Sequence, residues 1–301
     1  MHLWALRIFG VITTAGMLIV IIQGALVTQT GSGDACGAEW PLCYGQLIPS
    51  NPTIPTLIEY THRLVSGIMG LMVITHAVWS AVRLKHLRET RLFAVLSVFF
   101  IILQSLLGAG AVVWGQSDAI MALHFGFSLI SFTSVLLLTL LAFEDGKATR
   151  FTTPNISNAM RKYIYFLLIF IYAVVYTGAY VSHTGSGGAC GGWPLCNGNL
   201  VPSLNTSELI HYFHRFAAGT LFLFMVSLLA VAFKHCKKQL TLYVSILLST
   251  IFITVQVISG AFVIFTGFNL YATMFHAFMI SVLFGTFSYT ALLANRSGMK
   301  K

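Results

Sequence analysis

The chain of 301 residues is 57% hydrophobic and only 8% charged, and it carries a formal net charge of +9. A soluble domain has roughly a quarter of its residues charged, so this composition excludes an ordinary water-soluble protein and indicates an integral membrane protein. The excess of basic residues does not indicate nucleic-acid binding, because Lys and Arg gather in short loops between apolar segments, which is typical of membrane topology.

Eight apolar segments are each long enough to cross the roughly 30 Å hydrocarbon core of a bilayer as a helix. In chain order we expect them at residues 8–28, 62–82, 92–114, 119–143, 162–182, 213–233, 241–265 and 270–293. Helices are predicted because open strands would leave backbone groups unpaired in lipid. Two long polar loops, 29–61 and 183–212, separate the spans within each half. The predicted fold class is therefore all-α and integral to the membrane, with eight transmembrane helices.

The basic residues predict the orientation of these spans. With the N-terminus in the cytoplasm, all 17 Lys and Arg residues except Arg63 and Arg215 fall on the cytoplasmic side. The opposite orientation would violate the positive-inside rule in every loop. We therefore predict cytoplasmic N- and C-termini and place the two long loops on the outer face.

The two halves of the chain repeat one another at an offset of 152 to 154 residues, as between Thr30 and Thr184 or between His62 and His214. The segment TGSG recurs with the first pair, His-Arg with the second, and WPLC lies between them in both halves. Duplication of a four-helix unit predicts two pseudo-symmetric four-helix bundles in tandem, residues 1–150 and 151–301. Because four is an even number, both copies have the same orientation in the membrane.

Four of the five cysteines lie in the long loops, as two local pairs: Cys36 with Cys43, and Cys190 with Cys196. The outer compartment permits disulfides, and each pair is close enough in sequence to close a small loop. A structural staple is one interpretation, and a redox-active thiol–disulfide couple, mainly for the first pair, is the other. A zinc site is disfavoured because two cysteines alone leave the metal shell incomplete.

Each half also carries two histidines in different spans at matched depth. His62 and His214 stand at the start of the second and sixth spans, while His124 and His276 lie about one turn into the fourth and eighth. Ionisable residues inside a membrane are costly and usually functional. Two facing imidazoles suit the axial ligation of haem iron, and an apolar bundle suits the porphyrin. We therefore predict one haem site in each half.

Two further repeated pairs are open to more than one interpretation. Arg63 and Arg215 follow the first histidine of each half, where a guanidinium can pair with haem propionates or extend to lipid headgroups. Gly108 and Gly260 each lie in the span before the second histidine. They leave room for a flat macrocycle close to the backbone, or they allow tight helix packing.

The halves differ one turn before the first histidine, where Glu59 precedes His62 but His211 precedes His214. Residues three apart share a helix face, so Glu59 is predicted to point toward whatever His62 binds. A carboxylate there can take protons or stabilise positive charge, and an interfacial role near the helix dipole is the structural alternative. The asymmetry suggests one site that does chemistry and one that moves electrons.

Together these features resemble haem A synthase of the Gram-positive bacterial type, with a cysteine pair in each half. The resemblance rests on Glu-x-x-His-Arg at Glu59–Arg63, on His-Arg at His214, on His124 and His276, and on the cysteine-bearing loops. It covers all eight predicted helices. It implies oxidation of the methyl group at porphyrin carbon 8 of haem O to a formyl group, which yields haem A for terminal oxidases.

The resemblance also implies roles for these residues and halves. The N-terminal half would hold the substrate haem O at His62 and His124, with Glu59 as the catalytic carboxylate. The C-terminal half would hold the cofactor haem b, with His214 and His276 as axial ligands of the iron. The disulfides would be Cys36–Cys43 and Cys190–Cys196. Expected partners are haem O, membrane lipids, the farnesyltransferase that makes haem O, and a quinone or other electron acceptor, all at a bacterial cell membrane.

Two other function classes stay open at this stage. A di-haem b-type cytochrome that relays electrons from quinol needs the four histidines but has no use for the difference between Glu59 and His211. A haem carrier predicts weak, exchangeable ligation in both halves. The haems extracted from cells that also make haem O distinguish the three functions.

Overall fold

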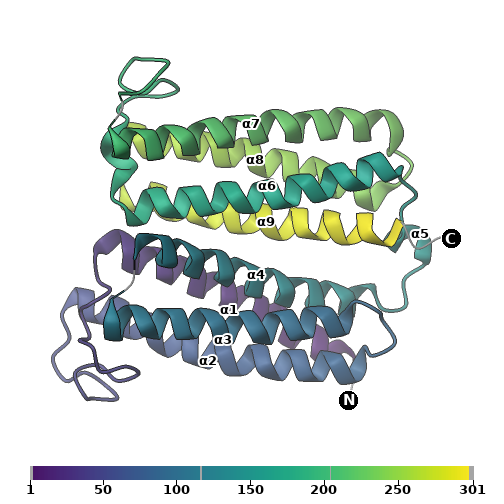
Figure 1. Cartoon of the computed structure of the whole chain (residues 1–301). Helices are drawn as coiled ribbons and strands as arrows, with labels where there is room; N and C mark the ends of the chain where they lie inside the picture. Colours follow the sequence, from purple (N-terminus) through teal and green to yellow (C-terminus); the bar gives the residue numbers. More distant parts are fainter. Residues whose placement is uncertain (1–2, 116, 204, 298–301) are drawn as a thin grey trace. The chain divides into compact units, whose positions relative to one another are not determined.

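The computed structural model describes residues 3–115, 117–203 and 205–297, and the chain divides into two compact units. The first unit comprises the chain as far as Phe143 together with Ser182–Thr184, and the second comprises Glu144–Val181 and the chain from Gly185 onwards. Each unit is built around four long helices (Figure 1). Across the described ranges, secondary structure other than helix is limited to two isolated β-bridges in loops.

The first unit contains four consecutive helices: α1 (Leu3–Thr30), α2 (Ile54–Arg83), α3 (Thr90–Trp114) and α4 (Asp118–Glu144). Helix α2 packs against both α1 and α3. A buried cluster of Ala77, Ala94 and Leu138 joins α2, α3 and α4 through small and apolar side chains. Small residues at this point allow the helices to approach closely without a hydrophobic driving force, which lipid cannot provide.

The second unit repeats this order with α6 (Asn158–His183), α7 (Thr206–His235), α8 (Leu240–Phe265) and α9 (Leu270–Ser297). A short helix, α5 (Thr149–Thr152), precedes them, and a 3₁₀ turn, η1 (Ser186–Ala189), lies between α6 and α7. Helix α8 packs against α7 and α9. Polar contacts cross the helix pairs, including the 2.5 Å hydrogen bond between Ser245 of α8 and Thr290 of α9.

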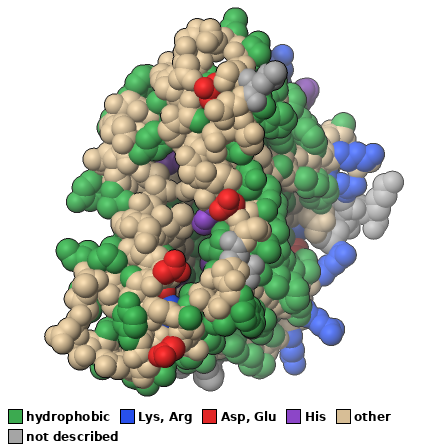
Figure 2. All heavy atoms as spheres, turned by 60° about the vertical axis from the view of Figure 1, so that its left-hand side comes forward, with side chains coloured by type: hydrophobic (Ala, Val, Ile, Leu, Met, Phe, Trp, Pro, Cys, Tyr) green, Lys and Arg blue, Asp and Glu red, His purple; other side chains and the backbone are tan. Residues whose placement is uncertain are grey.

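The predicted all-helical fold with eight membrane-spanning helices is confirmed. Within the described residues, eight helices of 25 to 30 residues are long and apolar enough to cross a membrane. Large apolar side chains such as Leu71, Ile169 and Leu223 are exposed along their flanks, where lipid would surround them. In Figure 2, hydrophobic side chains gather on the right of the view, beside the loop-bearing face.

The helices begin earlier than the apolar spans predicted, and this corrects the expected position of two histidines. Helix α2 begins at Ile54, not at residue 62, so His62 lies eight residues into it, about 12 Å along the axis. Helix α7 begins at Thr206, so His214 also lies eight residues in. The first two turns mix apolar residues with polar ones such as Glu59 and His211, and they fall outside the spans expected from hydropathy. Side-chain caps define the true starts, since Thr53 and Asn205 accept hydrogen bonds from backbone amides of the first turn.

The connections before α2 and α7 have the same local structure, and we name them the first cysteine loop (residues 31–53) and the second cysteine loop (residues 185–205). Disulfides Cys36–Cys43 and Cys190–Cys196 close them, which confirms the predicted pairing. A cis peptide bond precedes the proline of each WPLC segment, at Trp40–Pro41 and Trp193–Pro194. The second cysteine of each pair forms an isolated bridge, to Gln46 and to Asn199 respectively. The repeat seen in the sequence is therefore also a repeat in structure.

Candidate functional site

The structure brings the predicted histidine pairs together inside each unit. His62 of α2 and His124 of α4 lie close enough for their rings to interact electrostatically in the first unit. His214 of α7 and His276 of α9 do the same in the second unit. Each pair therefore joins the two helices that were expected to carry it, near the end of the bundle where the cysteine loop emerges.

A glycine of a neighbouring helix faces each of the four imidazoles. A Cβ added at that glycine would have the ring atom Cε1 as its nearest neighbour. The distances are 3.3 Å for Gly24 and His62, 3.3 Å for Gly108 and His124, 2.8 Å for Gly178 and His214, and 3.1 Å for Gly260 and His276. The glycines thus make room for the histidine rings themselves, a role that the sequence interpretation of Gly108 and Gly260 did not include.

Sequence reasoning did not single out Gly24 and Gly178, which complete the set. They lie at the same 154-residue offset as Thr30 and Thr184, so the repeat itself contained the signal. Each helix that lacks a paired histidine, α1, α3, α6 and α8, contributes one glycine. The four-helix unit is therefore built from two imidazole-bearing helices and two helices that receive the rings.

In the second unit, hydroxyl groups contact the imidazole nitrogens. The Oγ1 atom of Thr177 lies 3.0 Å from Nδ1 of His214, and the Oγ atom of Ser259 lies 2.9 Å from Nδ1 of His276. On the other side of the His276 ring, Nε2 lies 3.1 Å from the side-chain amide nitrogen of Gln256. That last contact must open for a metal to bind Nε2. In the described part of the first unit, Nδ1 of both His62 and His124 lacks a hydrogen-bond partner.

These donor sets fit haem iron better than a bare metal ion. Within the described residues, no group of three or more His, Cys, Asp or Glu side chains could hold a metal ion. A porphyrin supplies four nitrogen ligands of its own, so haem iron needs only two more from the protein, and each unit offers two imidazoles. The surroundings are apolar helix faces, which suit the macrocycle.

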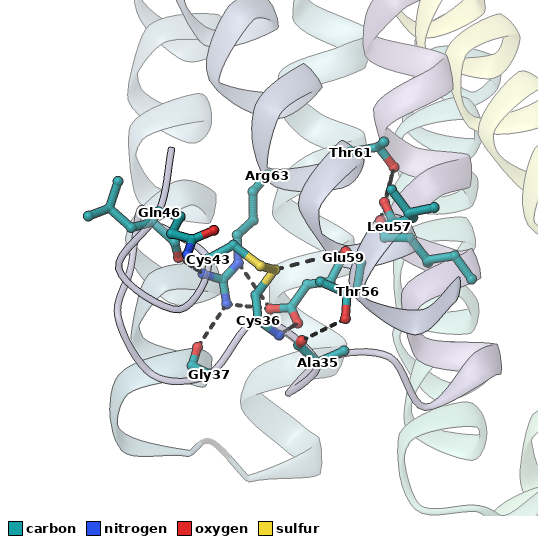
Figure 3. Close-up of a disulfide and its surroundings, with 12 residues drawn as sticks. Ala35, Cys36, Gly37, Cys43, Gln46, Thr56, Leu57, Glu59, Thr61 and Arg63 are labelled. Atoms are coloured by element: carbon teal, nitrogen blue, oxygen red, sulfur yellow. Dashed lines mark hydrogen bonds and ion pairs between the residues drawn. A yellow bond between two sulfur atoms is a disulfide. The ribbon is translucent and has the colours of Figure 1, made fainter. Parts of the chain in front are cut away.

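Glu59 lies beneath the first cysteine loop and is only 3% exposed. Its Oε2 atom accepts a 2.7 Å hydrogen bond from the backbone amide of Cys36, and its Oε1 atom accepts a 3.0 Å hydrogen bond from Nε of Arg63 (Figure 3). A second contact, from Nη2 of Arg63, completes the ion pair. Both carboxylate oxygens are therefore bound by groups on the cysteine-loop side of the bundle. Glu59 itself lies one turn before His62 in α2.

The guanidinium groups of Arg63 and Arg215 bind backbone carbonyl oxygens of the cysteine loops. Arg63 donates to the carbonyls of Leu42 at 2.8 Å and Gly37 at 3.2 Å, and Figure 3 shows it reaching over the disulfide. Arg215 donates to the carbonyls of Gly192 at 2.8 Å, Leu195 at 3.1 Å and Cys190 at 2.7 Å. The sequence interpretation did not include this role. The repetition of an arginine after a Gly-rich loop in both halves could have indicated it. Contact with haem propionates stays a prediction.

His211 replaces the carboxylate in the second unit. It is buried, and its Nε2 atom accepts a 3.1 Å hydrogen bond from Nε of Arg215. The nearest carboxylate on α7 is Glu208, one turn earlier, which accepts hydrogen bonds from the backbone amide and hydroxyl of Ser203 at 3.0 and 2.7 Å. Glu208 therefore holds the second cysteine loop from outside. In both units the arginine donates a hydrogen bond to the side chain four residues before it. That side chain is a carboxylate in the first unit and an imidazole in the second.

Comparisons with known proteins show which family the chain resembles. Residues 7–288 match the COX15-CtaA family, described as cytochrome oxidase assembly protein. A protein of Alkalihalophilus pseudofirmus named heme A synthase is 47% identical over 291 residues, which cover 97% of this chain and 98% of that protein. A heme A synthase of Shouchella clausii is 50% identical over 298 residues, 98% of this chain and 99% of that protein. The heme A synthase of Geobacillus kaustophilus is 45% identical over 293 residues, with coverages of 97% and 92%.

Proposed function

Because the chain belongs to the COX15-CtaA family of cytochrome oxidase assembly proteins, we propose that it is a haem A synthase of a bacterial cell membrane. It is an oxidoreductase that converts haem O to haem A by oxidising the methyl group at carbon 8 to a formyl group. Relatives with that name match it over nearly their whole length. The observation that carries the proposal is an imidazole pair in each apolar bundle, together with the buried carboxylate of Glu59 one helical turn before His62.

The two units have different haems in this proposal. His62 and His124 bind the substrate haem O in the N-terminal half, residues 1–150. His214 and His276 are axial ligands of haem b in the C-terminal half, residues 151–301. The difference between Glu59 and His211 supports this division, because a buried carboxylate in the first half stands where the second half has an imidazole. When bound, haem b supplies a redox centre to which electrons removed from the substrate can pass.

The contacts of Glu59 favour one of its two expected roles. Both carboxylate oxygens accept hydrogen bonds, from Arg63 and from the backbone amide of Cys36. Such charge-assisted hydrogen bonds stabilise the anion. A carboxylate whose two oxygens already accept hydrogen bonds is less available to take up a proton, and its paired charge can instead act on positive charge that develops at the methyl carbon. We therefore assign Glu59 an electrostatic role in the oxidation.

The remaining parts of the proposal concern the membrane and the partners. The cysteine loops face the outside, and the termini face the cytoplasm, as the distribution of Lys and Arg indicates. The farnesyltransferase that produces haem O supplies the substrate, and a quinone or another acceptor takes the electrons. Lipids surround the exposed apolar flanks of the helices.

The proposal is tested by expressing the protein in cells that make haem O but no haem A, and by extracting the haems. Haem A in the extract, identified by its chromatographic retention and absorption spectrum, is the expected result. An extract that contains only haem B and haem O would contradict the proposal and leave an electron-relaying cytochrome or a haem carrier. Cells that express the His276→Ala variant are the control, because they should retain haem O without converting it.

A further inference from the structure

The hydroxyl groups of Thr177 and Ser259 occupy equivalent places beside the two histidines of the second unit. Each is the residue directly before the glycine that faces the same ring, Gly178 or Gly260. Their oxygens lie 3.0 Å and 2.9 Å from the respective Nδ1 atoms. The same contact has therefore been built twice, on different helices.

The direction of these hydrogen bonds follows from the hydroxyl protons. Thr177 donates its proton to the carbonyl oxygen of Val174 at 2.8 Å, and Ser259 donates its proton to the carbonyl oxygen of Gln256 at 2.9 Å. A hydroxyl has one proton, so an oxygen that donates to its backbone carbonyl acts as acceptor toward the imidazole. Nδ1 of each histidine is then the protonated nitrogen, and Nε2 keeps its lone pair. This is the tautomer that an iron ligand through Nε2 requires.

Around His276, the glutamine contact is consistent with that tautomer. The side-chain nitrogen of Gln256 lies 3.1 Å from Nε2 of His276, and an amide nitrogen can only donate. Nε2 is therefore an acceptor in this contact. In this arrangement Nδ1 of His276 carries the proton and faces Ser259, while Nε2 has the lone pair and faces Gln256. The Ser259 hydroxyl, acting as acceptor, favours the same tautomer.

The first unit lacks both hydroxyl groups. Gln23 precedes Gly24 and Leu107 precedes Gly108, at the positions of Thr177 and Ser259. Among the described residues, Nδ1 of His62 and Nδ1 of His124 have no partner at hydrogen-bond geometry, and Oε1 of Gln23 is likewise unpaired. The hydroxyl is therefore the feature that distinguishes the two units at these positions.

We propose that Thr177 and Ser259 are positioning residues that make His214 and His276 permanent axial ligands, and that Gln23 and Leu107 deny this support to His62 and His124. A hydrogen bond to the outer nitrogen of a ligating histidine fixes the ring and raises its basicity, and its loss commonly reduces metal affinity by about 10- to 100-fold. The inference rests on the proposed function, because an enzyme must keep its cofactor but release its product. The structure thereby assigns retention of haem to the second unit and exchange of haem to the first.

The test measures retention of haem b in the purified full-length protein, with haem transfer to apomyoglobin as the readout. We expect Thr177→Val and Ser259→Ala to accelerate transfer by about 10-fold or more. The midpoint potential of haem b should also rise, because a less basic imidazole donates less electron density to the iron. Thr177→Ser keeps the hydroxyl and should behave like the unmodified protein, which distinguishes positioning from simple packing.

Matched controls come from the same unit. Ser249→Ala and Thr254→Val also remove hydroxyls that bond to a carbonyl of their own helix, but these hydroxyls have no contact with a histidine. Both controls should retain haem b normally. Equal transfer rates and potentials in the Thr177, Ser259 and control variants would overturn the proposal. Loss of haem from Thr177→Ser as well as from Thr177→Val would also contradict it.

A reciprocal variant tests the first unit. Leu107→Ser places a hydroxyl three residues after the carbonyl of Gln104, as Ser259 is placed after Gln256. We expect it to slow the release of haem from the first unit, so that more haem O and haem A remain with the purified protein. An unchanged amount of retained haem would contradict the inference even when haem A is made normally. A failure to make haem A in the unmodified protein would instead contradict the proposed function, and the haem b measurements would still stand.

Discussion

The backbone amide of Cys36 donates a 2.7 Å hydrogen bond to the carboxylate of Glu59. This contact joins a residue of the first disulfide to the residue that most distinguishes the two halves of the chain. Arg63 closes the arrangement, because it binds Glu59 and also two carbonyl oxygens of the same loop. The carboxylate, the arginine and the disulfide loop are therefore linked near the N-terminal end of α2, and changes in any of them should affect the others.

Replacing Glu59 with Gln should reduce the yield of haem A while haem b remains bound. The amide keeps the shape of the side chain but loses the negative charge, and removal of one electrostatic contact to a developing charge costs roughly 100- to 1,000-fold in rate. The measurement is the ratio of haem A to haem O in extracts, together with haem b per protein. Glu208→Gln is the matched control, since that carboxylate holds Ser203 in the second cysteine loop and has no expected role in the oxidation. A normal haem A yield in Glu59→Gln would refute the role assigned to Glu59.

Removal of the two disulfides should have unequal effects on activity. Each closes a short loop, with sequence separations of 7 and 6 residues, and loss of either should reduce stability by about 2 to 3 kcal/mol. Only the first disulfide contains a residue that binds Glu59. We expect the paired Cys36→Ser and Cys43→Ser variant to lose haem A yield beyond its loss of thermal stability, and the equivalent variant of the second loop to lose stability alone.

A staple and a redox couple make different predictions for that first variant. If the disulfide only orders the loop, activity should recover in part at low temperature, where the loop is better ordered. If its thiols exchange electrons with the substrate or with an acceptor, no temperature should restore turnover. Assays at several temperatures on both paired variants, with thermal unfolding measured in parallel, separate the two roles.

The arginines should control the mobility of their own loops. Arg63→Lys replaces a planar group with several donors by a single ammonium, which cannot reach Leu42, Gly37 and Glu59 together. We expect faster backbone hydrogen exchange in residues 31–53 and unchanged exchange in residues 185–205. Arg215→Lys should show the reverse pattern, so that each variant is the control for the other. Loss of bound haem without any change in loop exchange would favour propionate binding as the main role of these arginines.

The sequence predicted features that depend on composition and on long repeats. Eight spans followed from hydropathy, and the positions of the paired histidines and the local cysteine pairs followed from duplication. The true starts of α2 and α7 did not, because their first turns mix polar and apolar residues and are defined by caps such as Thr53. Contacts between helices were also beyond prediction. Neither the hydroxyl of Ser259 at His276 nor the carbonyl oxygens at Arg63 can be inferred without knowing which side chains face one another.

The orientation of the Glu59 side chain could be predicted only in part from helix periodicity. Its spacing from His62 on the helix was read as pointing toward the same ligand, and the side chain is indeed buried. The structure adds that both oxygens are bound from the loop side, which no helix periodicity contains. The repeat, by contrast, contains a further signal, since Gly24 and Gly178 occupy equivalent positions and each faces a histidine ring.

The glycines that face the histidine rings permit a graded test of the haem sites. A Cβ at Gly178 would lie 2.8 Å from the ring of His214, closer than real Cβ atoms approach, so Gly178→Ala must displace the imidazole. A ligand displaced by a few tenths of an ångström binds iron less well, and we expect haem b occupancy to fall by about 10-fold or more. Gly260→Ala, with 3.1 Å to the ring of His276, should have a smaller effect of the same kind. The absorption spectrum of the purified protein measures occupancy directly.

The same helix that carries His214 provides the control for this series. Gly219 lies in α7, and a Cβ there would meet nothing within 4 Å. Gly219→Ala should therefore keep full haem b occupancy and gain slightly in helix stability, because alanine is the better helix former. In the first unit, Gly24→Ala and Gly108→Ala should leave haem b untouched and lower only the yield of haem A, since each Cβ would stand 3.3 Å from the ring of a substrate-binding histidine. Loss of haem b from the first-unit variants and not from Gly178→Ala would reverse the assignment of the two haems.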